Sequence, residues 1–91
     1  MDKNIIDELT EKLRDIADDL YKGKTEIGMS RMNEVIPDMV LVTDTIQDEA
    51  VTNRMVQDAL NPLLGAMEDR DATLMADIIM YELIEILKDI A

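Results

Sequence analysis

The chain has 91 residues without cysteine, histidine, phenylalanine or tryptophan, and its 21 acidic and 9 basic residues give a net charge of −12. A chain of this length builds one small core, so we expect a single domain over residues 1–91. The negative charge repels polyanions, which argues against nucleic acid and acidic membranes as partners. Without cysteines, an export signal or a membrane span, the sequence predicts a cytoplasmic protein.

Apolar residues recur at steps of three and four residues throughout the chain, which predicts an all-helical fold. The first helix is expected over residues 4–22, with one narrow apolar stripe and a stop at Gly23. Its stripe consists of Ile6, Leu9, Leu13, Ile16 and Leu20.

The second helix is expected over residues 26–47, with Thr25 as its N-terminal cap. Pro37 lies inside it, but the apolar spacing keeps the same phase on both sides of the proline. A bend within one helix therefore explains the pattern better than a break. The predicted stripe is Met29, Met32, Ile36, Met39, Thr43 and Ile46.

The third helix is expected over residues 49–69 after an Asp48 cap, and the last over residues 72–90 after an Asp71 cap. Pro62 poses the same alternative as Pro37: it kinks the third helix, or it opens a separate short helix. The apolar face of the third helix contains Met55, Val56, Ala59, Leu60, Leu63 and Met67.

Links this short force consecutive helices to run in opposite directions, which predicts an antiparallel, up-down four-helix bundle. A three-helix arrangement completed by a second chain is the structural alternative. Periodicity does not separate the two arrangements.

The last helix is too apolar for a helix with one buried side. Its inward stripe is predicted to contain Ala76, Ile79, Leu83, Ile86 and Ile90. Leu74, Ile78 and Tyr81 form a second stripe on the opposite side, which a neighbouring helix, a second copy or a different protein should cover. The methionines offer a further hint, because flexible thioethers suit both core gaps and adaptable binding surfaces.

The sequence argues against an enzyme, because the chain lacks the histidine and cysteine residues that most nucleophilic and metal sites use. Asp69 and Asp71 open like a calcium loop, but Leu74 occupies the position that needs glycine and Met80 the position that needs glutamate. The three glycines form no phosphate-binding motif. We therefore expect no enzyme activity, no cofactor and no metal.

The stretch of residues 66–71 (AMEDRD), with LMADII at 74–79 and YEL at 81–83, resembles a C-terminal pattern of small acidic helical proteins of Gram-positive bacteria without assigned activity. More loosely, the size, acidity and helical organisation resemble those of flagellar export chaperones, which hold substrates such as flagellin before secretion. This second resemblance implies that an amphipathic substrate helix binds along an apolar groove.

The sequence thus predicts a non-catalytic protein-binding module, chaperone-like or an adaptor, which holds an apolar helix of a partner protein. The predicted contacts are Leu74, Ile78 and Tyr81, together with Met29 and Met32. The alternative is a structural homodimer whose second apolar stripe is used in self-association. These two functions differ in whether the molecule associates with itself or with another protein.

Overall fold

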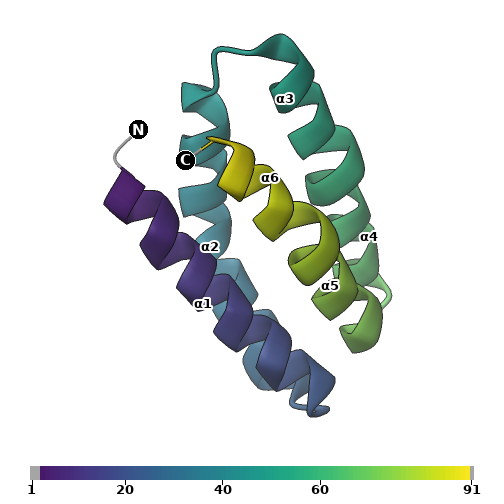
Figure 1. The fold of residues 1–91 in the computed structure, drawn as a ribbon. Coiled ribbons are helices and arrows are strands. Elements are labelled where there is room, and N and C mark those ends of the chain that lie inside the picture. Colours follow the sequence, from purple (N-terminus) through teal and green to yellow (C-terminus); the bar gives the residue numbers. More distant parts are fainter. Residues whose placement is uncertain (1–2, 91) are drawn as a thin grey trace.

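The computed structural model describes residues 3–90, and this part of the chain is helical and contains no strand. Four helices are joined by short links at residues 22–24, 46–48 and 69–71 (Figure 1). All their ends agree with the sequence prediction to within about two residues. The first two helices are α1 (Lys3–Tyr21) and α2 (Thr25–Thr45). The third helix consists of α3 (Glu49–Arg54), η1 (Met55–Leu60) and α4 (Asn61–Glu68). The last helix consists of α5 (Ala72–Ile78), η2 (Ile79–Leu83) and α6 (Ile84–Ile90).

The helix ends follow from local chemistry. Gly23 closes α1 with a φ of 80°, a backbone conformation that glycine adopts without steric cost. The Asp48 carboxylate accepts hydrogen bonds from the N–H groups of Ala50 and Val51, and Asp71 accepts one from Leu74, so both predicted caps are confirmed. The prediction for Thr25 is wrong: it is the first residue of α2, and the preceding residue forms no side-chain cap.

The core is built from apolar side chains alone, and among the described residues no polar or charged side chain is buried. The α1 stripe is confirmed, because each of its five predicted members is buried. In α2 the buried face is turned slightly from the predicted one. Val35 and Val42 are buried, whereas Ile36, Thr43 and Ile46 are half-buried.

Each of the last two helices contains a π-helical segment, which the apolar pattern did not predict. The N–H of Asn61 donates to the carbonyl of Val56, and that of Ile84 to the carbonyl of Ile79, so these bonds span five residues. Asn61 follows η1 directly and Pro62 comes next, and the backbone stays helical at Asn61. Pro62 therefore does not open a separate helix.

The four helices differ in how many neighbours they have. α2 packs mainly against α1, and the third helix packs mainly against the last helix. The last helix packs against both α1 and the third helix, and η1 and η2 lie against each other (Figure 1). The last helix therefore buries more of its circumference than a helix with one neighbour. No helix in residues 3–90 has both the length and the apolar character needed to cross a membrane.

Candidate interaction surface

The two aromatic residues of the chain, Tyr21 and Tyr81, lie at the same edge of the bundle, between α1 and the last helix. Tyr21 is the last residue of α1 and Tyr81 lies within η2. Their side chains are 48% and 71% exposed, and Tyr81 is the most exposed large apolar side chain of the described residues. The helix pairing thus places both aromatic rings at the surface, where another molecule can reach them.

A hollow of about 280 Å³ lies beside Tyr21. Ala17 is buried and Met80 is half-buried, so they form its floor, while Arg14 and Asp18 share its rim with Tyr21. Because the side chain of Ala17 is small, a space remains there between α1 and the last helix. We call this surface the tyrosine edge, and it consists of Arg14, Ala17, Asp18, Tyr21, Met80 and Tyr81.

One hydrogen bond fixes the position of Tyr21 on the tyrosine edge. Its phenol donates to Oδ1 of Asp77 at 2.6 Å. This bond raises the pKa of Tyr21 to about 12, with further contributions from desolvation and from the negative charge of Asp77. At neutral pH the phenol therefore remains protonated and acts as a hydrogen-bond donor, which is unsuited to general-base catalysis.

The predicted contacts on the last helix separate in the structure. Leu74 and Tyr81 are exposed, but Ile78 is only 7% exposed and belongs to the core. The prediction that Ile78 is an exposed contact is wrong. The prediction assumed that the last helix has one neighbouring helix, whereas this helix packs against α1 on one side and the third helix on another. Ile78 lies at the margin of this wider buried arc.

The two methionines proposed as contacts do not join the tyrosine edge, because both lie in α2. Met32 is fully buried, so the prediction that it is an accessible contact is wrong. Met29 is half-buried against the core. Met80 and Tyr21 were not among the predicted contacts. The rarity of aromatic residues in this chain was the available signal for Tyr21, since tyrosine, methionine and arginine are enriched in protein interfaces.

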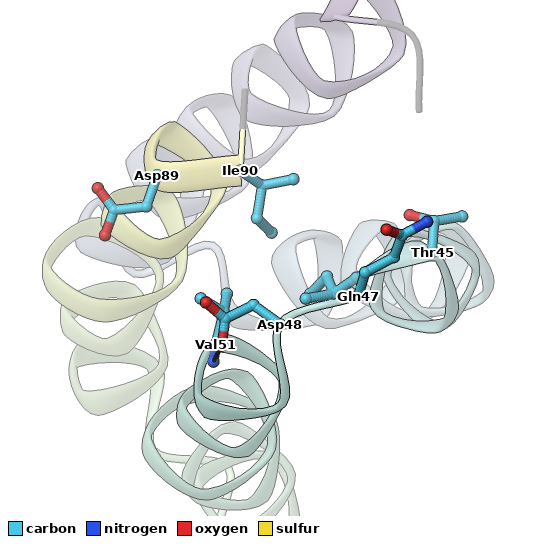
Figure 2. Close-up of a pocket in the computed structure, with 7 residues that line it drawn as sticks. Thr45, Gln47, Asp48, Val51, Asp89 and Ile90 are labelled. Carbon is cyan, nitrogen blue, oxygen red and sulfur yellow. Dashed lines mark hydrogen bonds between the residues drawn. The ribbon is translucent and has the colours of Figure 1, made fainter.

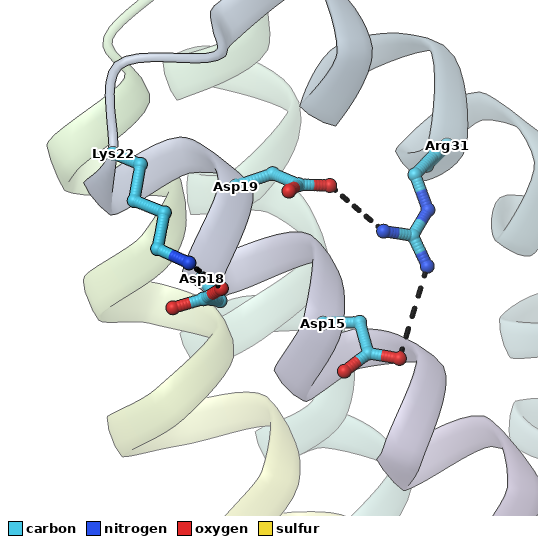
Figure 3. A network of polar contacts seen from close by, with 5 residues as sticks. All are labelled: Asp15, Asp18, Asp19, Lys22 and Arg31. Carbon is cyan, nitrogen blue, oxygen red and sulfur yellow. Dashed lines mark hydrogen bonds and ion pairs between the residues drawn. The ribbon is translucent and has the colours of Figure 1, made fainter.

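The α1 carboxylates near the tyrosine edge form two sets of ion pairs, one of which joins α1 to α2 (Figure 3). Lys22 contacts Asp18 at 2.8 Å, within α1 and the link that follows it. Arg31 of α2 reaches Asp19 at 2.7 Å and Asp15 at 3.9 Å. The α1 carboxylates on the side toward α2 are therefore matched by an arginine, whereas Asp18, on the other side, is paired only with an exposed lysine.

A second cavity, of about 390 Å³, lies where α2, α3 and α6 meet at one end of the bundle (Figure 2). Its carboxylates already have partners: Asp48 caps α3, and Asp89 accepts a hydrogen bond from Arg54 at 2.7 Å. The cavity also has no aromatic lining. The absence of an aromatic side chain from this lining favours the tyrosine edge as the interaction surface. The lining residues are Thr45, Ile46, Gln47, Asp48, Val51, Asp89 and Ile90.

Comparison with known proteins gives a family and no function. No curated protein matches the chain, and neither does any solved structure. One family model covers residues 3–91, and its description is a domain of unknown function (DUF8042). Since the match extends over nearly the whole sequence, the chain belongs to the DUF8042 family.

Proposed function

We propose that this chain is a non-catalytic protein-binding module, chaperone-like or an adaptor, which holds an apolar helix of a partner protein on the tyrosine edge. The observation that supports the proposal is the hollow lined by Tyr21, Ala17 and Met80, together with the exposed ring of Tyr81, the residue that follows Met80 on the last helix. Aromatic side chains provide large contact areas at low entropic cost and often dominate binding energy. Met80 adds a flexible surface that adapts to different apolar side chains.

The mode of binding that fits this surface is a helix in a groove. The hollow lies between two helices, and a partner helix can place apolar side chains one turn apart against it. Leu74, seven residues before Tyr81 on the last helix, is a further exposed apolar side chain that a partner could cover. Catalysis, cofactors, nucleic acid and membranes have no part in the proposal, and we place the protein in the cytoplasm.

The test compares proteins captured from a lysate of the native host by the tagged chain and by two variants. Tyr81→Ser removes the exposed ring, and Leu41→Ser is the matched control, because Leu41 is 61% exposed but lies on α2. One stoichiometric partner that is lost with Tyr81→Ser and retained with Leu41→Ser supports the proposal. A partner retained by both variants contradicts the assignment of the surface.

The proposal includes the up-down order of the bundle, with bends at Pro37 and Pro62. Two contacts support this order: Tyr21 at the end of α1 bonds Asp77 early in the last helix, and Arg54 early in the third helix bonds Asp89 late in the last. Residual dipolar couplings of the backbone amides would measure the helix directions and the two bends. A parallel pair of consecutive helices would contradict the order.

One finer assignment rests on resemblance alone. The likeness to small acidic proteins of Gram-positive bacteria brings no activity with it, and from the likeness to flagellar export chaperones we propose that the partner is a secretion substrate. The support is the helical architecture and acidity, which many unrelated proteins share. Identification of the captured partner as a secreted or flagellar protein is the result expected from this assignment.

A structural homodimer is the second candidate function, and the exposed apolar side chains of α2 favour it. Ile27, Val40 and Leu41 are each about half exposed or more. Self-association through these residues would bury them. Sedimentation at low micromolar concentration separates the two candidate functions. A mass of two chains that falls to the mass of one chain in Leu41→Ser supports the homodimer. The mass of one chain for the natural protein contradicts the homodimer.

A further inference from the structure

The charges around the tyrosine edge bear on the chemistry of its partner. Asp18 lies on the rim of the hollow and Asp77 lies beside Tyr21, while Glu85 follows one turn after Tyr81. The nearby lysines are already engaged, because Lys22 pairs with Asp18 and Lys88 with Glu85 at 3.3 Å. The apolar centre is thus bordered by three carboxylates and by Arg14, which shares the rim of the hollow, and the lysines that pair with Asp18 and Glu85 are exposed and weakly held.

The excess of negative charge around this edge comes from the molecule as a whole. A net charge of −12 on a body with principal extents of 36 × 24 × 20 Å produces a negative potential over most of its surface. A second copy of the chain would bring the same charge against it, so the field opposes self-association at this edge. A cationic partner would instead be attracted and oriented by the same field.

We infer that the partner segment of the tyrosine edge is a basic amphipathic helix, whose apolar side covers Tyr21, Met80 and Tyr81 and whose lysines or arginines face Asp18, Asp77 and Glu85. The inference rests on the proposed function and adds the charge of the partner to it. Apolar contact supplies most of the affinity in such an interface, and charge complementarity supplies selectivity and a faster association.

The experiment uses two synthetic peptides of about 18 residues, which is about 27 Å of helix. Both have leucines at helical spacing on one side; the other side carries lysines in the first peptide and glutamates in the second. Binding to the full chain is measured by fluorescence anisotropy. We expect the lysine peptide to bind about ten-fold more tightly than the glutamate peptide, with the difference shrinking as salt is raised.

Variants locate the binding. Asp18→Lys changes the rim of the hollow, and Asp44→Lys changes an exposed position on α2, so the net charge becomes −12 + 2 = −10 in both. Because their total charge is equal, any difference between them is local. We expect Asp18→Lys to weaken binding of the lysine peptide about three-fold more than Asp44→Lys does. Tyr81→Ser should weaken it about ten-fold or more.

Each other outcome has a definite meaning. Equal binding of both peptides, lost in Tyr81→Ser, overturns the inference about charge and leaves the proposed function standing. Binding of the lysine peptide that is indifferent to Tyr81→Ser, and equal in the two charge variants, reveals attraction to net charge alone and overturns the inference. Binding of neither peptide contradicts the proposed function itself. Circular dichroism of each variant confirms that its helices are intact.

Discussion

The phenol of Tyr21 donates a 2.6 Å hydrogen bond to the carboxylate of Asp77, and this bond joins the end of α1 to the first half of the last helix. The bond also opposes ionisation of Tyr21, because a tyrosinate would place a second negative charge beside Asp77. A side chain at the centre of the proposed surface is thereby held in one protonation state and one position.

Replacement of Asp77 by asparagine should lower the pKa of Tyr21. Asp77→Asn keeps a hydrogen-bond acceptor but removes the charge, so we expect the pKa to fall from about 12 toward the ordinary 10.0. Tyrosinate absorbance measures this change directly, because Tyr21 and Tyr81 are the two tyrosines and the chain has no tryptophan. Asp44→Asn is the control. An unchanged titration in Asp77→Asn would contradict the role of this carboxylate.

The raised pKa also predicts how stability depends on pH. Tyr21 has a pKa of about 12 in the folded chain and an ordinary value of 10.0 when unfolded, so the unfolded state loses this proton first. The stabilising contribution is complete below the unfolded value and is lost as pH rises through the folded value. Urea midpoints measured across this window should fall less steeply for Asp77→Asn than for the natural chain. Parallel slopes would contradict the linkage.

The contact between Leu20 of α1 and Gly28 of α2 predicts opposite effects of two glycine substitutions. A Cβ atom on Gly28 would lie 2.5 Å from Cδ2 and 2.7 Å from Cγ of Leu20, so the buried side chain of Leu20 would have to shift within the core. We expect Gly28→Ala to lower the free energy of unfolding by about 1 to 3 kcal/mol, measured by urea denaturation.

Gly65→Ala is the matched control, because Gly65 also lies in a helix but its added Cβ would meet no atom within 4 Å. Alanine restricts the conformations of the unfolded chain and favours the helix, so the free energy of unfolding of this variant should be higher by about 0.5 to 1 kcal/mol. The same change in both variants would show that helix propensity, and not the contact with Leu20, determines the result.

The cap of α5 predicts a smaller effect. Asp71 accepts the N–H of Leu74 at 3.1 Å, and its negative charge faces the positive end of the helix dipole. Asp71→Ala should lower the free energy of unfolding by about 1 kcal/mol. Asp69→Ala, two residues earlier in the same link, makes the same change in charge outside the cap position. Thermal unfolding should therefore separate the two variants, and equal losses would argue against the cap.

The parts of the fold that were predictable depend on local signals. The α1 stripe has three- and four-residue steps on a helix with charged residues elsewhere, so burial follows directly from the sequence. Gly23, Asp48 and Asp71 mark helix ends by their own backbone or side-chain chemistry. These features need no knowledge of which helices are neighbours.

The candidate site was only partly predictable, because it depends on contacts between distant segments. Tyr81 and Leu74 were identified from the helical wheel, and both are exposed. The bond from Tyr21 to Asp77 joins residues 56 positions apart, and no local pattern signals it. The π segment η2 changes the spacing that a regular helical wheel assumes. The burial of Ile78 required knowing that the last helix has two neighbours.

Ile78 and Tyr81 should therefore respond in opposite ways to the same substitution. Ile78→Lys would place a charge without a partner in the apolar core, so we expect the loss of most of the folding free energy. Tyr81→Lys changes a side chain that is 71% exposed, so helical circular dichroism and the melting temperature should stay near those of the natural chain. A folded Ile78→Lys variant would show that Ile78 is accessible to solvent and does not belong to the core. An unfolded Tyr81→Lys variant would show that the ring of Tyr81 stabilises the fold. That second result would remove the main support for the tyrosine edge as a binding surface.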